Sequence, residues 1–142
     1  MEQQFNEQQL VQLVRQEEAN LASKEEYFMK LRNVLGETAK SIDSLKEIQK
    51  NPGKIIVRLG AGILVDAEIT NTTTCKRTFS ENGFQETKIN DTLKWLEEKQ
   101  GQLENQLGKV QADLVASKNN IDQIVGAIRQ IESEKQKNIS VK

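Results

Sequence analysis

Histidine is absent from this sequence of 142 residues, and cysteine occurs once, as Cys75. The common zinc sites need several His or Cys ligands, and the usual nucleophile pairs need a His beside Ser or Cys, so neither kind of site can be assembled. Aromatic residues make up only 4% of the chain, which is too few for a thick globular core. We therefore expect a protein that is not an enzyme and that has no catalytic, cofactor-binding or metal-binding residues.

An excess of charge of either sign is also missing. Lys and Arg number 20 against 21 Asp and Glu, which gives a net charge of −1. No long stretch is strongly basic, so the electrostatic footprint of a nucleic-acid-binding protein is absent. No apolar run is long enough to span a membrane, and the polar start at Met1 is unlike a signal peptide. We expect a cytoplasmic protein with no nucleic-acid or membrane partner.

Proline is equally scarce, and its position divides the chain. Pro52 is the only proline, and together with Gly53 it predicts the end of a helix, because the ring disfavours helix at the preceding residue and glycine suits a C-terminal cap. Residues 1–50 and 90–142 are rich in Glu, Gln, Lys and Leu and are predicted to be helices. Residues 52–88 are rich in Thr, Gly and β-branched residues and are predicted to be strands.

Both helical segments carry a heptad repeat of apolar residues. Eight of eleven positions that step by four and three from Leu10 to Leu45 are apolar, and eleven of fourteen are apolar from Ile89 to residue 135. We call these the seam positions. A repeat of about 3.5 residues held this long requires a partner along the whole helix. The polar interruptions are Glu17, Lys24, Thr38, Gln100, Ser117 and Lys135.

The two helices are predicted to pair with each other, because their lengths are similar and a short strand-rich piece between them can reverse the chain. The predicted fold class is α+β, a long antiparallel two-helix coiled coil joined by two β-hairpins. Asn90 is predicted to be the N-cap of the second helix. Trp95, near the start of that helix, is expected to pack on the strands.

The first predicted hairpin pairs residues 54–59 with residues 63–70. Its turn is Gly60-Ala61-Gly62, where glycine supplies the positive φ that tight hairpins need. This turn is not a phosphate-binding loop, because no Lys-Ser/Thr follows it and no helix starts there. A second and more polar hairpin is predicted from residues 74–80 and 84–88.

One face of the first hairpin is apolar, and a hairpin this small is marginal in water by itself. We therefore expect the apolar face to pair with strands of other subunits. The predicted oligomerisation residues are Val57, Leu59, Ile63, Val65, Ala67 and Ile69.

This order of elements resembles the alpha class of prefoldin subunits. The most specific part is Val57-Arg58-Leu59-Gly60-Ala61-Gly62 followed by Val65-Asp66-Ala67-Glu68-Ile69, although Arg58 stands where the family has a proline. Two hairpins, rather than one, match the alpha class. The resemblance implies an ATP-independent co-chaperone, a holdase built as a hexamer of two alpha and four beta subunits. It completes the predicted fold class, because it implies that the two β-hairpins form a β-barrel with other subunits. It also implies that the tips of the coiled coils hold unfolded client proteins and deliver them to a cytosolic chaperonin.

Apolar residues gather near the free ends of both predicted helices, in keeping with that role. A two-helix seam covers only one narrow stripe, so part of this surface should stay exposed. The alternative is that these are ordinary surface residues on fraying ends. A different function also stays open, namely a structural scaffold that homo-oligomerises through its hairpins and holds no client. The predicted client-binding residues, called the tip residues below, are Phe5, Leu10, Val11, Leu13, Val14, Ile128, Ile131 and Ile139.

Overall fold

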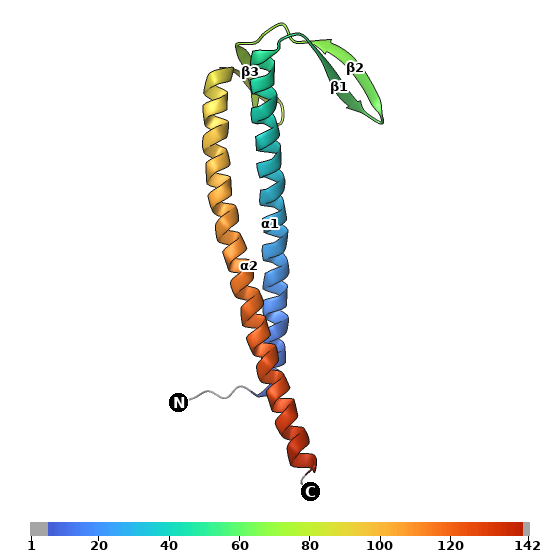
Figure 1. Cartoon of the computed structure of the whole chain (residues 1–142), viewed down its shortest axis with the longest axis vertical. Coiled ribbons are helices and arrows are strands. Elements are labelled where there is room, and N and C mark those ends of the chain that lie inside the picture. The colour runs from blue at the N-terminus through green and yellow to red at the C-terminus, as the bar shows by residue number, and fades with distance from the viewer. Residues whose placement is uncertain (1–5, 141–142) are drawn as a thin grey trace. The chain divides into compact units, whose positions relative to one another are not determined.

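The computed structural model describes residues 6–140, and the side chains of residues 6–138. Helix α1 (Glu7–Lys50) is followed by strands β1 (Lys54–Gly60), β2 (Ile63–Glu68), β3 (Thr74–Ser80) and β4 (Gly83–Lys88), and then by helix α2 (Ile89–Ser140). Figure 1 shows this order as two continuous helices with both hairpins between them in the chain. The predicted helix–strand–helix pattern is confirmed.

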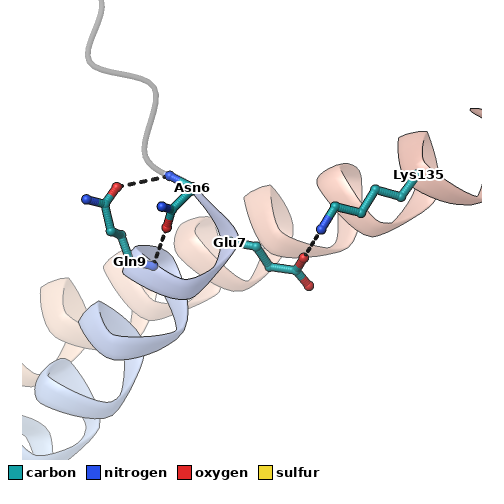
Figure 2. Close-up of polar contacts among 4 residues, drawn as sticks. All are labelled: Asn6, Glu7, Gln9 and Lys135. Carbon is teal, nitrogen blue, oxygen red and sulfur yellow. Dashed lines mark hydrogen bonds and ion pairs between the residues drawn. The ribbon is translucent and has the colours of Figure 1, made fainter.

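Helix α1 starts with a cap that the sequence analysis did not predict. The amide of Gln9 donates to Oδ1 of Asn6, and the amide of Asn6 donates to Oε1 of Gln9 (Figure 2). This reciprocal pair satisfies two amides that have no partner inside the helix. Among the described residues the first helix begins at Glu7, and it ends at Lys50, just before Pro52.

The predicted cap of the second helix is wrong. Helix α2 already includes Ile89, whose amide donates to the carbonyl of Thr73 at 2.9 Å. Asn90 therefore lies in the first turn, and its Oδ1 accepts a hydrogen bond from Nε2 of Gln49 at 2.8 Å. The side chain connects the end of α1 to the start of α2 instead of capping a helix.

The chain forms two compact units. One, which we call the end unit, consists of residues 6–32 and 105–140; the other, the hairpin unit, consists of residues 33–104. In both units the helices pack along the predicted seam. All hydrophobic side chains that are buried among the described residues occupy seam positions, namely Leu10, Leu31, Ile42, Ile89, Leu93, Leu96, Leu103, Leu114 and Ile124.

Three polar interruptions of the seam are accommodated by hydrogen bonds. In the end unit, Nζ of Lys24 donates to Oγ of Ser117 at 2.9 Å, so two interruptions on opposite helices pair with each other. In the hairpin unit, the buried hydroxyl of Thr38 donates to the carbonyl of Val34 one turn earlier, at 2.8 Å. The coiled coil can therefore contain these residues without leaving a buried polar group unpaired.

Each hairpin is a separate two-stranded antiparallel sheet. In the first, Val57 pairs with Val65 and Ile55 with Ala67, and the register shifts between Arg58 and Gly60. Ala61 and Gly62 at the turn have φ of 51° and 78°, the left-handed conformation that glycine adopts readily and alanine does not. Strand β2 ends at Glu68, two residues earlier than predicted.

The second hairpin is anchored on the helices of the hairpin unit. The buried cluster of Ile42, Ile89, Leu93 and Leu96 is covered in part by Leu45 and by Cys75 of β3. Beside it, the hydroxyls of Thr87 and Thr92 lie 2.7 Å apart, and Sγ of Cys75 lies 3.4 Å from the Thr92 hydroxyl. The single cysteine is thus a packed side chain.

Candidate functional site

The predicted oligomerisation residues fall into two groups in the first hairpin. Val57, Ala67 and Ile69 are half-buried, whereas Leu59, Ile63 and Val65 are exposed, with 40% of Val65 accessible to solvent. The register places Val57 directly opposite Val65, so these two side chains share one face of the sheet. This face is available for contact with another chain.

Exposed apolar residues also occur where the sequence analysis did not place them. Ile56 and Leu64 point to the opposite face of the first hairpin, beside Asp66 and Glu68, and both are exposed. In the second hairpin Phe84 is exposed and Phe79 is 72% exposed. For Ile56 and Leu64 the available signal was the run of apolar residues in each strand of the first hairpin, which breaks the simple alternation of a half-buried strand. Phe79 and Phe84 lie in polar strands that contain no such run.

The tip residues that the structure describes are less exposed than the hairpin residues. Leu10 is buried, with 8% accessible, and it lies in the seam rather than on the surface. Val11, Leu13, Val14, Ile128 and Ile131 are half-buried. Phe5 and the Ile139 side chain lie outside the described residues.

An ion pair joins the two helices near their free ends. Nζ of Lys135 lies 2.5 Å from Oε2 of Glu7, and Figure 2 shows the two side chains reaching toward each other from α1 and α2. In an antiparallel pair this contact places Ile131 at the level of Val11, and Ile128 at the level of Val14. The structure therefore brings tip residues of both helices to the same levels of the end unit.

The same ion pair changes the acidity of the carboxyl. The hydrogen bond from Lys135 and the positive charge of its ammonium lower the pKa of Glu7 below the ordinary value of 4.5. Lys135, a predicted interruption of the seam, thus makes a polar contact between the C-terminal part of α2 and the first turn of α1.

No group of three or more Cys, Asp and Glu side chains is arranged to hold a metal ion within residues 6–138. No helix among the described residues is long and apolar enough to cross a membrane. The exposed apolar residues described above lie on the faces of the two hairpins.

A solved structure has the same fold. The cryo-EM structure of filamentous PFD from Methanocaldococcus jannaschii matches with a TM-score of 0.56 at 15% sequence identity, covering 87% of this chain and 98% of that chain. A search of curated proteins finds no match. Two long helices joined by small hairpins thus define the prefoldin fold.

The sequence itself gives the family. Residues 16–134 match the family model described as Prefoldin subunit, so this chain belongs to the prefoldin family. The matched range contains most of both helices and all four strands. The resemblance to the prefoldin family noted from the hairpin residues is confirmed, and with it a chaperone-type function.

Proposed function

We propose that this protein is an alpha-class prefoldin subunit that acts as an ATP-independent holdase in the cytoplasm, with no catalytic activity of its own. The observation that carries the proposal is the family match over residues 16–134, combined with four strands arranged as two hairpins. Two hairpins per chain are the feature by which the resemblance selects the alpha class over the beta class.

Assembly is assigned to the hairpins. A free two-stranded hairpin with apolar residues on its surface is marginal in water and has unpaired edges, so strands of other subunits would stabilise it in a shared β-barrel. Val57, Leu59, Ile63, Val65, Ala67 and Ile69 are the residues proposed for this contact. The expected partners are beta-class subunits, four for every two chains of this kind.

Client binding is assigned to the tip residues. Val11, Leu13 and Val14 on α1 and Ile128 and Ile131 on α2 are half-buried in the single chain, so each keeps some apolar surface for an unfolded polypeptide. Contacts this small bind weakly one at a time. Several subunits in one assembly would raise the affinity through effective concentration, and the client would then pass to a cytosolic chaperonin.

The test is a refolding assay with a denatured client protein, in the absence of ATP. The chain assembled with a one-hairpin prefoldin subunit is expected to keep the client soluble and to release it to a chaperonin. A non-hydrolysable nucleotide should leave this protection unchanged. Aggregation of the client at the same rate with and without the assembly would overturn the proposal.

A second candidate function is a scaffold that homo-oligomerises and holds no client. It is supported by the filamentous assembly of the solved relative and by the exposed Phe79 and Phe84 of the second hairpin of this chain. The two candidates are separated by the mass of the purified chain before and after a one-hairpin subunit is added. Large homo-oligomers that do not bind the added subunit and do not protect a client from aggregation would favour the scaffold.

A further inference from the structure

A groove of about 600 Å³ lies in the hairpin unit, between the second hairpin and the helices. Its floor contains Leu45 of α1, Leu96 of α2 and Cys75 of β3, all of which are buried or half-buried. Ser41 and Ser44 of α1 line one side and are exposed. The groove is therefore lined mostly by polar and charged side chains around a small apolar floor, and none of its lining residues is a tip residue or belongs to the first hairpin.

Three cationic side chains from three different elements line this groove. They are Lys40 of α1, Arg77 of β3 and Lys99 of α2. Lys76 also contributes to the lining, but its Nζ lies 4.9 Å from the centre of the Phe84 ring. Among the described residues that line the groove there is no carboxylate, although the whole chain carries slightly more Asp and Glu than Lys and Arg. Cations gathered without a counter-charge favour an anionic ligand.

The ring of Trp95 contacts two of these cations. The guanidinium carbon of Arg77 lies 3.6 Å from the centre of the Trp95 ring, and Nζ of Lys99 lies 5.1 Å from it. Stacking on an aromatic ring orients a guanidinium while leaving its edge free to donate two parallel hydrogen bonds to a carboxylate. Arg77 is exposed, so this edge is accessible from solvent.

The lining also discriminates between kinds of anion. Single-stranded nucleic acid binds where several aromatic rings stack on bases beside the cations, but Trp95 is the only aromatic residue of the groove and Arg77 already stacks on it. The small apolar floor beside the cations suits a single aliphatic side chain flanked by carboxylates. Within this chain Asp66-Ala67-Glu68 has such a pattern, but it is held in strand β2, paired with β1, so the segment is assigned to another protein.

We propose that this groove binds an extended acidic peptide segment of another protein, with carboxylates on Arg77, Lys99 and Lys40 and an apolar side chain over Leu45 and Leu96. The site is additional to the proposed client-binding and assembly surfaces. It gives the hairpin unit a partner-binding surface that does not depend on whether the tip residues hold clients.

Trp95 provides the probe for the test, because it is the only tryptophan in the chain. The full-length chain, assembled as purified, is titrated with a short synthetic peptide in which Asp and Glu flank one central Leu. Its Trp95 fluorescence and the anisotropy of a label on the peptide are followed together. Saturable binding is expected, and raising the salt concentration should weaken it.

Substitutions then place the peptide in the groove. Arg77→Gln combined with Lys99→Gln is expected to weaken binding about tenfold or more, since hydrogen bonds to charged groups are worth more than 1.4 kcal/mol each. Lys94→Gln is the matched control, because Lys94 is an exposed cation on the same helix that does not line the groove. It should bind the peptide like the parent protein, and circular dichroism should show that all variants are equally helical.

Several results would overturn the proposal. The first is equal binding of a peptide in which Asn and Gln replace Asp and Glu. Displacement of the acidic peptide by inorganic phosphate at the same concentration would show a simple anion site, and tighter binding of a single-stranded oligonucleotide would show a nucleic-acid site. If the groove variant and Lys94→Gln had equal effects on peptide binding, the peptide would not bind in the groove. Self-association of the chain that blocks the peptide would show that the groove binds a second copy of the chain.

Discussion

Glycine has two opposite roles in this chain at the scale of the single residue. Gly62 has a φ of 78° at the turn of the first hairpin, where a side chain would be strained. Gly36 and Gly101 lie inside the helices, and a Cβ added at either position would meet no atom within 4 Å. The same residue type is therefore required at the turn and costs stability in the coiled coil.

We expect alanine substitutions to separate these roles. Gly36→Ala and Gly101→Ala should each raise the free energy of unfolding by about 1 kcal/mol, because alanine loses less backbone entropy in a helix. Gly62→Ala should lower it by about 1–2 kcal/mol, because the turn conformation is left-handed. Urea unfolding followed by circular dichroism measures all three. A loss of stability in the helix variants would contradict the packing described for the seam.

The pair of Glu7 and Lys135 predicts a dependence on pH. The pKa of Glu7 is lowered in the folded protein, so the stability gained from the pair is present above the ordinary value of 4.5 and is lost as the pH falls through the lower value of the folded state. Glu7→Gln should therefore be less stable than the parent protein at neutral pH, and the two should become equally stable in acid. Urea unfolding of both proteins across this range makes the comparison, and a difference that does not change with pH would contradict it.

At the scale of the element, the polar contact inside the seam of the end unit calls for an explanation. Lys24 and Ser117 occupy positions where a leucine would bury more apolar surface, yet they form a hydrogen bond across the two helices. A polar pair inside a coiled coil costs stability but favours one register over its alternatives. We interpret this pair as a marker of the antiparallel alignment of α1 and α2.

Replacement of the pair tests this interpretation. Lys24→Leu together with Ser117→Ala should raise the free energy of unfolding by about 1–2 kcal/mol through apolar burial. Ser117→Ala alone should lower it by about 1 kcal/mol, since the half-buried ammonium of Lys24 then loses its partner. The double variant is expected to pair its helices less uniquely, which disulfide trapping between cysteines placed on the two helices would detect. A double variant less stable than Ser117→Ala would refute this account.

The elements were predictable from the sequence where the signal is periodic or local. The heptad repeat identified every buried hydrophobic residue among those described, and the glycines at 60 and 62 located the turn. The Asn6–Gln9 cap was missed although its spacing was visible, and Asn90 was misassigned because its partner, Gln49, is far away in the chain. The contact of Arg77 with Trp95 joins a strand to a helix and has no local signature.

For the whole molecule, the first hairpin is the proposed point of assembly. Val65→Asp places a charge on the apolar face that Val65 shares with Val57, and burying that charge in a barrel would be costly. We expect the assembly to dissociate while helicity stays nearly unchanged, because the helices pack through their own seam. Light scattering and circular dichroism report the two properties. Leu64→Asp, on the opposite face, is the control and its assembly should keep its mass. Dissociation of the Leu64 variant with an intact Val65 variant would show that the face was wrongly chosen.

The proposed capture of clients places its contacts at the free ends of the helices, far along the chain from the hairpins. Val11 and Ile131 lie at one level of the end unit and are half-buried. Val34 and Val115 offer a matched control, because they are exposed apolar residues of α1 and α2 that are not tip residues. Exposed charges are screened beyond a Debye length of about 3 Å in 1 M salt, so capture by apolar contacts should persist there.

The most direct measurement is the protection of a refolding client by three assembled proteins at low and high salt: the parent, Val11→Ser with Ile131→Ser, and Val34→Ser with Val115→Ser. The account predicts that the tip variant loses most of its protection while keeping its mass, that the control protects like the parent, and that salt changes neither result. Equal protection by all three proteins, or protection abolished by salt alone, would contradict it.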